Sequence, residues 1–194
     1  MMLLNILIIG FSCSSMASEV VENFKAESVV PDVVDVAPKA KISLIYPGNK
    51  EVNFNELTPT VVRPQQPEVK WETDPNKFYT LSNVDPDAPS RATPTFREIN
   101  HWLVVNINGN DLSTGQTLVS YRGSGAPRGT GLHRYIFLVF EQQGEINVTE
   151  IQNLANDVTK FSIRKFAQKY NLGNPVAGNF YLAQWDSSVP ERKQ

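Results

Sequence analysis

Short apolar runs separated by turn residues are the feature of this chain that most restricts its fold. From Lys41 onward these runs are rich in β-branched and aromatic residues, which favour strands over helices. Turn sequences such as Asp74-Pro75-Asn76 and Asn108-Gly109-Asn110 divide them. The rhythm predicts a mostly antiparallel β protein. The expected strands are Lys41–Tyr46, Val61–Val62, Val69–Trp71, Phe78–Val84, His101–Ile107, Thr117–Tyr121, His133–Glu141 and Phe180–Gln184.

Helical spacing appears in two C-terminal segments. Ser162 is placed to cap a helix, and Gly173 is placed to end it. The apolar face of this helix would comprise Ile163, Phe166, Ala167 and Tyr170. A weaker pattern predicts a second helix at Glu150–Val158. The chain shows no internal repeat and no long linker, so one domain is expected.

Composition narrows the class of protein. The 194 residues are 41 % hydrophobic and 20 % charged, as in ordinary globular proteins. The 18 basic and 20 acidic residues leave a net charge of −2, which argues against a nucleic-acid partner. No internal apolar run reaches the length of a membrane-spanning helix, so stable membrane insertion is not expected.

The first seventeen residues predict a signal peptide. They carry no charge, their apolar stretch Leu3–Phe11 is too short to span a bilayer, and Ser15-Met16-Ala17 fits a cleavage site. We expect cleavage after Ala17 and a secreted, extracellular domain of residues 18–194. The alternatives are a buried N-terminal strand or helix and a lipid anchor at Cys13. The mature chain would contain no cysteine, which excludes thiol catalysis and thiolate metal sites.

Two features follow from this expectation. Residues 18–40 are predicted to form a short helix, with Val20, Val21 and Phe24 on one face, and then an arm interrupted by prolines. The sequence Asn147-Val148-Thr149 is a glycosylation sequon beside a turn, so a secreted chain would present Asn147 as an acceptor.

Polar residues concentrate in three segments. Asp85-Pro86-Asp87-Ala88-Pro89-Ser90-Arg91 follows a predicted strand and forms a stiff loop, although a simple acidic turn would have the same composition. His101 begins another strand. A glycine-rich run from Gly123 leads into His133, the only other histidine, and lacks both the P-loop and the Rossmann pattern. Ends of antiparallel strands meet at one rim of a sheet, so these segments can share a site.

The same segments resemble a known family. Asp85–Arg91, Arg97-Glu98-x-x-His101-Trp102, Gly129–Tyr135 and Leu172–Gly178 are similar to the signature blocks of the phosphatidylethanolamine-binding proteins, and the resemblance covers residues 29–190. It implies a large central antiparallel sheet, a second smaller sheet and helices toward the C-terminus. It also implies a non-catalytic protein, without cofactor or metal, with a small pocket for phosphate, phosphorylated head groups or other small ligands. The implied ligand-binding residues are Asp85, Asp87, Pro89, His101, Gly125, Pro127, His133 and Tyr135.

The chemistry of these residues suits an anion. The Tyr135 hydroxyl, the two imidazoles and the glycine-loop N–H groups can donate hydrogen bonds. Asp85 and Asp87 would repel a dianion, so we expect them to orient and charge the histidines or to pair with an ethanolamine ammonium. The corresponding hypothesis is that anion affinity rises as pH falls through the histidine titration.

Two departures from the family pattern concern the pocket. Ile99 stands where the family often carries Trp, which would remove an aromatic wall. The chain also stops at Glu191-Arg192-Lys193-Gln194, where relatives can continue with an aromatic segment over the pocket.

Other functions stay open at this level. A secreted protease inhibitor or signalling modulator would need only a surface loop, and a protein partner of this kind is the main alternative. A divalent-metal hydrolase could use Asp85, Asp87, His101 and His133 as ligands. Ser90 and Ser124 lie in no nucleophile elbow, which disfavours a serine hydrolase. Nothing in the sequence requires more than a monomer.

Overall fold

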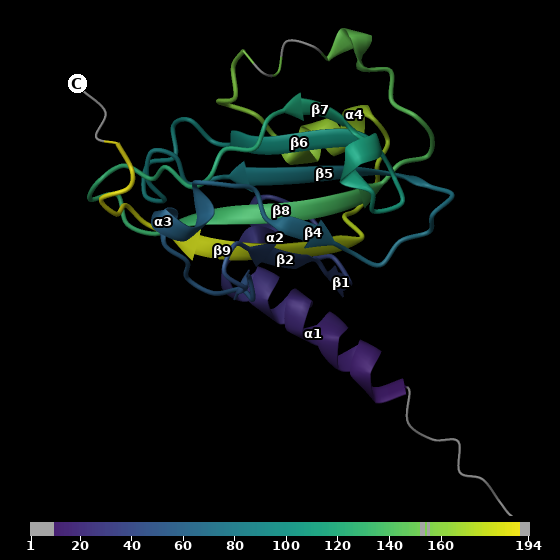
Figure 1. Cartoon of the computed structure of the whole chain (residues 1–194), viewed down its shortest axis with the longest axis horizontal. Coiled ribbons are helices and arrows are strands. Elements are labelled where there is room, and N and C mark those ends of the chain that lie inside the picture. The colour runs from purple at the N-terminus through teal and green to yellow at the C-terminus, as the bar shows by residue number, and fades with distance from the viewer. Residues whose placement is uncertain (1–9, 152–153, 155, 191–194) are drawn as a thin grey trace, which may run out of the picture.

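A computed structural model describes residues 10–151, 154 and 156–190 (Figure 1). Its strands form one sheet in the order β1-β9-β8-β5-β6-β7 and a smaller sheet in the order β3-β2-β4. The main-sheet strands are β1 (Ala40–Lys41), β9 (Ala177–Ala183), β8 (His133–Glu141), β5 (Phe78–Asp85), β6 (Ile99–Asn108) and β7 (Gln116–Val119). The smaller sheet comprises β3 (Lys50–Glu51), β2 (Ser43–Tyr46) and β4 (Glu68–Lys70). The pairings are antiparallel except β1 with β9, so the main sheet is mixed and not wholly antiparallel.

Burial explains which strands are central. Nearly every residue of β5, β6 and β8 is buried, because the sheet is covered on both faces. One face packs against helices through Ile136, Leu138 and Phe140, and the other packs against the smaller sheet through Tyr135, Phe137 and Val139. By contrast, β2 alternates between exposed and buried residues because it has one solvent face.

Helices complete the layers. They are α1 (Gly10–Ala26), α2 (Val29–Asp32), α3 (Pro59–Val62) and α4 (Ile163–Lys169), with 3-10 turns at Leu112–Thr114 and Val148–Glu150. Ser162 caps α4 as expected, and its side chain accepts a hydrogen bond from the Lys165 N–H. None of the described helices is long and apolar enough to span a membrane.

The helix α1 docks through Val20 and Phe24, which are fully buried, in agreement with the expected apolar face. The Phe24 ring lies 5.7 Å from that of Phe180 on β9. Gly178 on the same strand makes this contact possible, because a Cβ there would lie 2.7 Å from the Phe24 ring. The helix passes through the expected cleavage position after Ala17. Residues 1–9 of the expected signal peptide lie outside the described part of the chain.

Three expected elements differ in the structure. Residues 61–62 belong to the helix α3 and not to a strand, because Pro59 occupies its first turn and favours a helix start there. Residues 41–46 are divided at Ile42 between the two sheets, so they do not form one strand. The helix expected at 150–158 is also wrong. None of its described residues, 150, 151, 154 and 156–158, is α-helical, and residues 152, 153 and 155 lie outside the described part of the chain. Beside and within this range, Asn147 and Asp157 accept hydrogen bonds from the backbone N–H groups of Thr149 and Thr159.

The other predicted strands are present with shifted ends. His133–Glu141 matches β8, whereas β6 begins at Ile99, so His101 is its third residue. Expected strand ends at Tyr121, Trp71 and Gln184 extend past the observed β7, β4 and β9.

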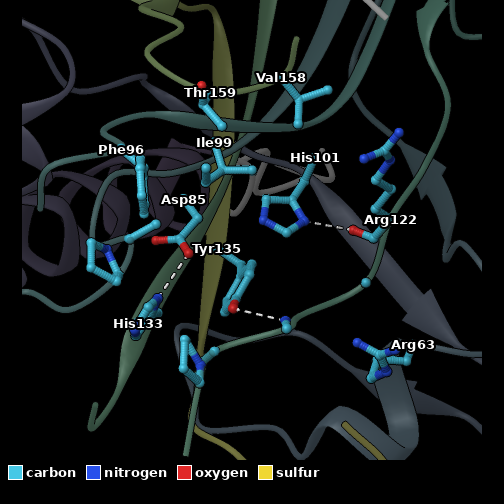
Figure 2. A pocket seen from close by; sticks show the side chains of 16 residues that line it. Arg63, Asp85, Phe96, Ile99, His101, Arg122, His133, Tyr135, Val158 and Thr159 are labelled. Atoms are coloured by element: carbon cyan, nitrogen blue, oxygen red, sulfur yellow. Dashed lines mark hydrogen bonds and ion pairs between the residues drawn. The ribbon is translucent and has the colours of Figure 1, made fainter. Parts of the chain in front are cut away.

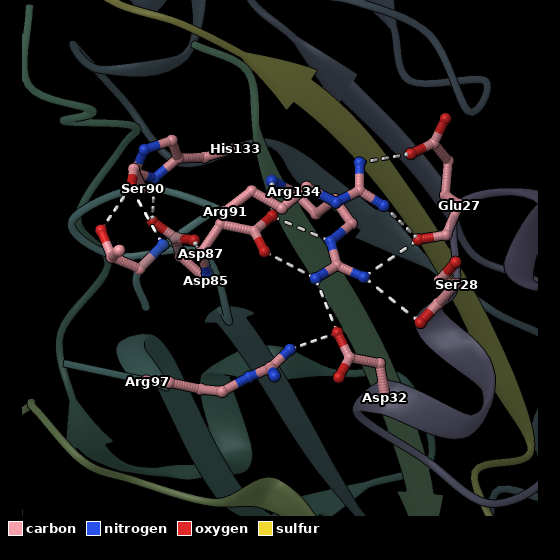
Figure 3. A network of polar contacts seen from close by, with 11 residues as sticks. Glu27, Ser28, Asp32, Asp85, Asp87, Ser90, Arg91, Arg97, His133 and Arg134 are labelled. Carbon is pink, nitrogen blue, oxygen red and sulfur yellow. Dashed lines mark hydrogen bonds and ion pairs between the residues drawn. The ribbon is translucent and has the colours of Figure 1, made fainter. Parts of the chain in front are cut away.

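Arg134 on β8 joins the N-terminal segment to the sheet (Figure 3). Its side chain is 2 % exposed. The guanidinium donates to both carboxylate oxygens of Asp87 at 2.8 and 2.6 Å and to Asp32 of α2 at 2.7 Å. Its remaining nitrogen, Nη1, donates to the carbonyls of Glu27 and Ser28. Because every nitrogen of the guanidinium is bonded, its charge is compensated inside the protein.

Loss of the Asp87 carboxylate therefore leaves a buried cation without its main partner. We expect Asp87→Asn to lower the free energy of unfolding by about 3–5 kcal/mol. Arg91→Ala breaks an exposed pair with Glu27 and should cost under about 1 kcal/mol. Urea unfolding of both variants measures the difference, and similar small losses would show that the buried pair contributes little.

Candidate functional site

A cavity of about 510 Å³ lies where β5 ends and β8 begins (Figure 2). Antiparallel pairing places Asp85 beside Ile99 of β6 and close to His133 at the start of β8. The glycine-rich segment before β8 and the helix α3 close the opposite side. The lining residues are Arg63, Asp85, Ala88, Pro89, Phe96, Ile99, His101, Arg122, Gly123, Gly125, Ala126, Pro127, His133, Tyr135, Val158 and Thr159.

The structure brings together all but one of the site residues implied by the resemblance. Asp85, Pro89, His101, Gly125, Pro127, His133 and Tyr135 all line this cavity. Asp87 does not. Its carboxylate is turned to Arg134 and orients neither histidine, so the expected role for Asp87 in charging the imidazoles is wrong. Its backbone N–H instead donates to Asp85 Oδ1 at 2.7 Å, which helps to hold that side chain.

His133 is engaged at both ring nitrogens. Nδ1 lies 2.8 Å from Asp85 Oδ2, and Nε2 lies 3.1 Å from the Thr130 hydroxyl. The Thr130 hydroxyl itself donates to the Pro127 carbonyl. The expectation that both imidazoles donate to an anion therefore fails for His133, since its nitrogens already have partners.

His101 has one nitrogen left for a ligand. Nδ1 donates to the Arg122 carbonyl at 2.8 Å, which leaves Nε2 without a partner among the described residues. Burial lowers the pKa of His101, and the attraction of the Asp85 carboxylate only partly offsets this. The ring is thus neutral at pH 7, and Nε2 is a hydrogen-bond acceptor.

Tyr135 lies at the floor of the cavity between the two histidines. Its ring meets His101 edge-on at 5.1 Å and stacks on Tyr181 at 5.0 Å. The hydroxyl accepts a hydrogen bond from the Gly125 N–H at 3.2 Å. Burial holds the pKa of Tyr135 well above 10, so the hydroxyl keeps its proton and can donate it to a ligand.

Two arginines that the sequence reasoning missed also line the cavity. Arg63, at the end of α3, donates to the Ser124 carbonyl at 2.9 Å. Arg122 is exposed, and its guanidinium has no partner among the described residues. Both lie across the cavity from the Asp85–His133 pair (Figure 2). Arg122 adjoins the glycine-rich run and was the one local signal available, whereas nothing near Arg63 in sequence indicates a site.

Gly123 allows Arg63 to reach the cavity. A Cβ at this position would lie 2.4 Å from the Arg63 Cα and from the Val62 carbonyl oxygen. Only glycine permits the two backbones to approach this closely. The glycine-rich segment therefore packs against α3, and its Gly125 N–H is bonded to the Tyr135 hydroxyl.

An apolar wall faces the polar groups. It contains Phe96, Ile99 and Val158, and Phe96 is 43 % exposed at the mouth. Ile99, the expected departure, contributes an aliphatic side chain to this wall, in which Phe96 is the aromatic member. Residues 191–194, where the sequence is expected to differ from relatives with a longer C-terminal segment, lie outside the described residues.

Glu98, next to Ile99 in the chain, joins this wall to the segment that leads into α4. Its backbone exchanges hydrogen bonds with Phe161, and its carboxylate accepts from the Ile163 N–H that begins α4. Burial raises the pKa of Glu98 to about 7, although the nearby Arg97 and Arg164 oppose this rise.

This pKa makes stability depend on pH. The folded protein binds the Glu98 proton more tightly than the unfolded chain, whose carboxyl titrates near 4.5. The resulting stabilisation is complete below pH 4.5 and is lost as pH rises through 7, a change of about 3 kcal/mol. We expect Glu98→Gln, which retains an acceptor, to remove this decline.

The comparison requires unfolding free energies of both proteins between pH 5 and 8. His101 acts in the opposite direction, because its lowered pKa makes stability rise as pH rises through 6.5. The difference between the two proteins isolates Glu98, since His101 is common to both. Parallel pH profiles would contradict the assignment.

The geometry does not favour the metal-hydrolase alternative. In the described part of the chain, no three His, Cys, Asp or Glu side chains are grouped as metal ligands would be. Asp87 is committed to Arg134, and the Nδ1 of His133 is committed to Asp85.

Comparisons with known proteins agree with this architecture. The family model for phosphatidylethanolamine-binding proteins matches residues 48–181. A Drosophila melanogaster protein named "Putative odorant-binding protein A5" is 35 % identical over 97 % of this chain and 93 % of its own length. The solution structure of CG7054 is 46 % identical, with a TM-score of 0.68 over 84 % of this chain and 94 % of that one.

Two more distant structures share the fold. Carboxypeptidase Y inhibitor, solved with its cognate proteinase, has a TM-score of 0.74 at 22 % identity and covers 88 % of this chain and 97 % of that one. The phosphatidylethanolamine-binding protein of Plasmodium vivax has a TM-score of 0.69 at 24 % identity, covering 86 % and 98 %. With the matched family model and the relative aligned along nearly its whole length, the chain belongs to the phosphatidylethanolamine-binding protein family.

Proposed function

We propose that this chain is a secreted, non-catalytic binding protein for small anions that carry an apolar part. Phosphate and phosphorylated head groups represent the anionic end of such ligands. The observation that carries the proposal is the pairing, in one cavity, of the Arg63 and Arg122 guanidinium groups with the apolar wall of Phe96, Ile99 and Val158. A volume of about 510 Å³ is in the range of small-molecule sites.

Charge decides how the anion lies. Asp85 is buried beside His133 and would repel a second anion placed against it. The arginines lie on the other side, and the Tyr135 hydroxyl adds a donor at the floor. The anionic group therefore binds toward Arg63 and Arg122, and a ligand hydroxyl or ammonium can donate to His101 Nε2.

The hydrogen bonding around His133 supports a non-catalytic role. Asp85, His133 and the Thr130 hydroxyl form a sequence of groups like that of a hydrolase triad. The hydroxyl proton, however, is donated to the Pro127 carbonyl, and Thr130 is not among the residues that line the cavity. This hydroxyl is not presented to a substrate, so the set serves to hold the loop.

The names of two relatives bear on the ligand and the partner. The relative named for odorant binding aligns along nearly the whole chain, which supports a small amphipathic ligand. The inhibitor solved with its proteinase supports a protein partner as the second candidate. At 22 % identity that likeness extends to the fold and not to a contact surface, so the small-ligand proposal comes first.

Arginines keep their charge at neutral pH, so they replace the imidazolium of the initial hypothesis as the source of positive charge. We expect sulfate, whose charge is constant in this range, to bind with nearly the same affinity at pH 6 and pH 8. Arg122→Gln should weaken sulfate and phosphoethanolamine binding at least fivefold in calorimetric titrations, since a hydrogen bond to a charged group contributes about 1.5–3 kcal/mol.

Arg91→Gln is the matched control, because it removes the same charge from a residue that does not line the cavity. A steep loss of sulfate affinity between pH 6 and 8 would restore the histidine hypothesis. Equal weakening by both variants would show that only the overall charge matters, and absence of saturable binding to folded protein would contradict the anion proposal.

Secretion has its own test. Asn147 is exposed, and its sequon belongs to a 3-10 turn at the surface. Expressed in a eukaryotic secretory host, the chain should leave the cell with Ser18 at its N-terminus and carry a glycan. Glycosidase treatment should then reduce its apparent mass, and Asn147→Gln should abolish that reduction. Retention in the cell with an intact N-terminus would refute the proposal of secretion.

A further inference from the structure

A second cavity of about 470 Å³ lies between α4 and the segment before it. Thr159 lines both this cavity and the proposed anion site, so the two lie on either side of one chain segment. The floor of the second cavity is a row of aromatic rings. The ring of Phe166 lies 5.9 Å from Phe161 and 4.7 Å from Tyr170. Phe161 and Tyr170 are partly exposed, so this row offers apolar surface to a ligand.

Three lysines surround the aromatic row. Lys165 and Lys169 stand one turn apart on α4, and Lys160 comes from the preceding segment. All three are exposed, and none belongs to an ion pair among the described residues. Lys169 Nζ instead lies over the Tyr170 ring at 5.1 Å from its centroid.

Asp157 is the one acidic residue that lines the cavity, and its carboxylate already has hydrogen-bond partners. Asp157 accepts hydrogen bonds from the Thr159 N–H at 2.9 Å and from its hydroxyl at 2.7 Å. Three lysines against this one acid make the cavity locally cationic, although the whole chain has a net charge of −2. Like charges one helical turn apart are mildly destabilising, so a bound anion would relieve them.

We propose that this cavity, here called the lysine groove, binds a medium-chain carboxylate, with the alkyl chain on the aromatic row and the carboxylate among Lys160, Lys165 and Lys169. The groups that line the groove favour this ligand chemistry over related ones. A compact dianion such as sulfate would leave the aromatic row unused. A neutral alkane would have no charge interaction with the lysines, and they would repel an alkylammonium cation.

The site is independent of the proposed anion site, and its ligand need not occupy both. The segment bearing Thr159 is fixed by backbone hydrogen bonds between residues 96–100 and 158–161, so the groove keeps its own boundary. Failure of either proposal therefore leaves the other standing, and the experiment must measure the two sites separately.

The test uses octanoate, decanoate, decanol and decyltrimethylammonium as probes, with calorimetry below their aggregation concentrations. Burial of each methylene should raise affinity about fourfold, so decanoate should bind about 15-fold more tightly than octanoate. Decanol should bind several-fold more weakly than decanoate, and decyltrimethylammonium should not bind. Lys165→Gln/Lys169→Gln should weaken decanoate at least fivefold and reduce its sensitivity to salt, of which Lys160 retains a part.

Matched controls separate the alternatives. Lys39→Gln/Lys50→Gln removes the same charge from exposed lysines outside the groove and should leave decanoate binding unchanged. Arg122→Gln should also leave it unchanged while weakening sulfate. The proposal is overturned if decanol binds as well as decanoate, or if decanoate is lost in Arg122→Gln but retained in the α4 double variant. Absence of saturable decanoate binding to the folded wild-type chain would overturn it as well.

Discussion

The buried ion pair between Asp87 and Arg134 is the interaction on which the rest of the site depends. A guanidinium that is 2 % exposed must have all its donors satisfied, and here two segments far apart in sequence satisfy them. The pair fixes the loop after β5 against β8, and it also binds the N-terminal segment through Asp32 (Figure 3). Because this ion pair fixes the helix-facing side of the main sheet, the cavity on the opposite face can be preformed.

Alternation along the strand separates structural from ligand-facing roles. His133 and Arg134 are neighbours in β8, and they point to opposite faces. His133 reaches the cavity beside Asp85, whereas Arg134 meets Asp87 on the helix side. The two aspartates of the same loop are thereby assigned different tasks. The cavity contains one carboxylate, that of Asp85, which is bonded to the His133 imidazole. Arg63 and Arg122 supply the positive charge available to a ligand.

Most strands were predictable because their signals are local. The apolar content of β5, β6 and β8 and the turn residues between them act over a few residues, and His133–Glu141 is matched at both ends. Residues 61–62 were mistaken for a strand, since two valines favour strands while Pro59 and the packing of Gly123 on α3 favour a helix. The helix predicted at 150–158 is absent from the described residues of that range, where side-chain hydrogen bonds of Asn147 and Asp157 to nearby N–H groups compete with helical hydrogen bonding.

The sequence by itself determined the family blocks and the β architecture, and it allowed Asp85, His101 and His133 to meet, because antiparallel strands can bring such positions to one rim. Only the tertiary structure decided which atoms face a ligand. Hydrogen-bond partners from distant segments occupy Asp87 and the Nδ1 of His133, Thr130 in the preceding loop occupies its Nε2, and burial keeps His101 neutral. The close approach of α3 delivers Arg63 across the cavity. Charge and burial at a site depend on which segments pack together, and no local pattern in the chain encodes that packing.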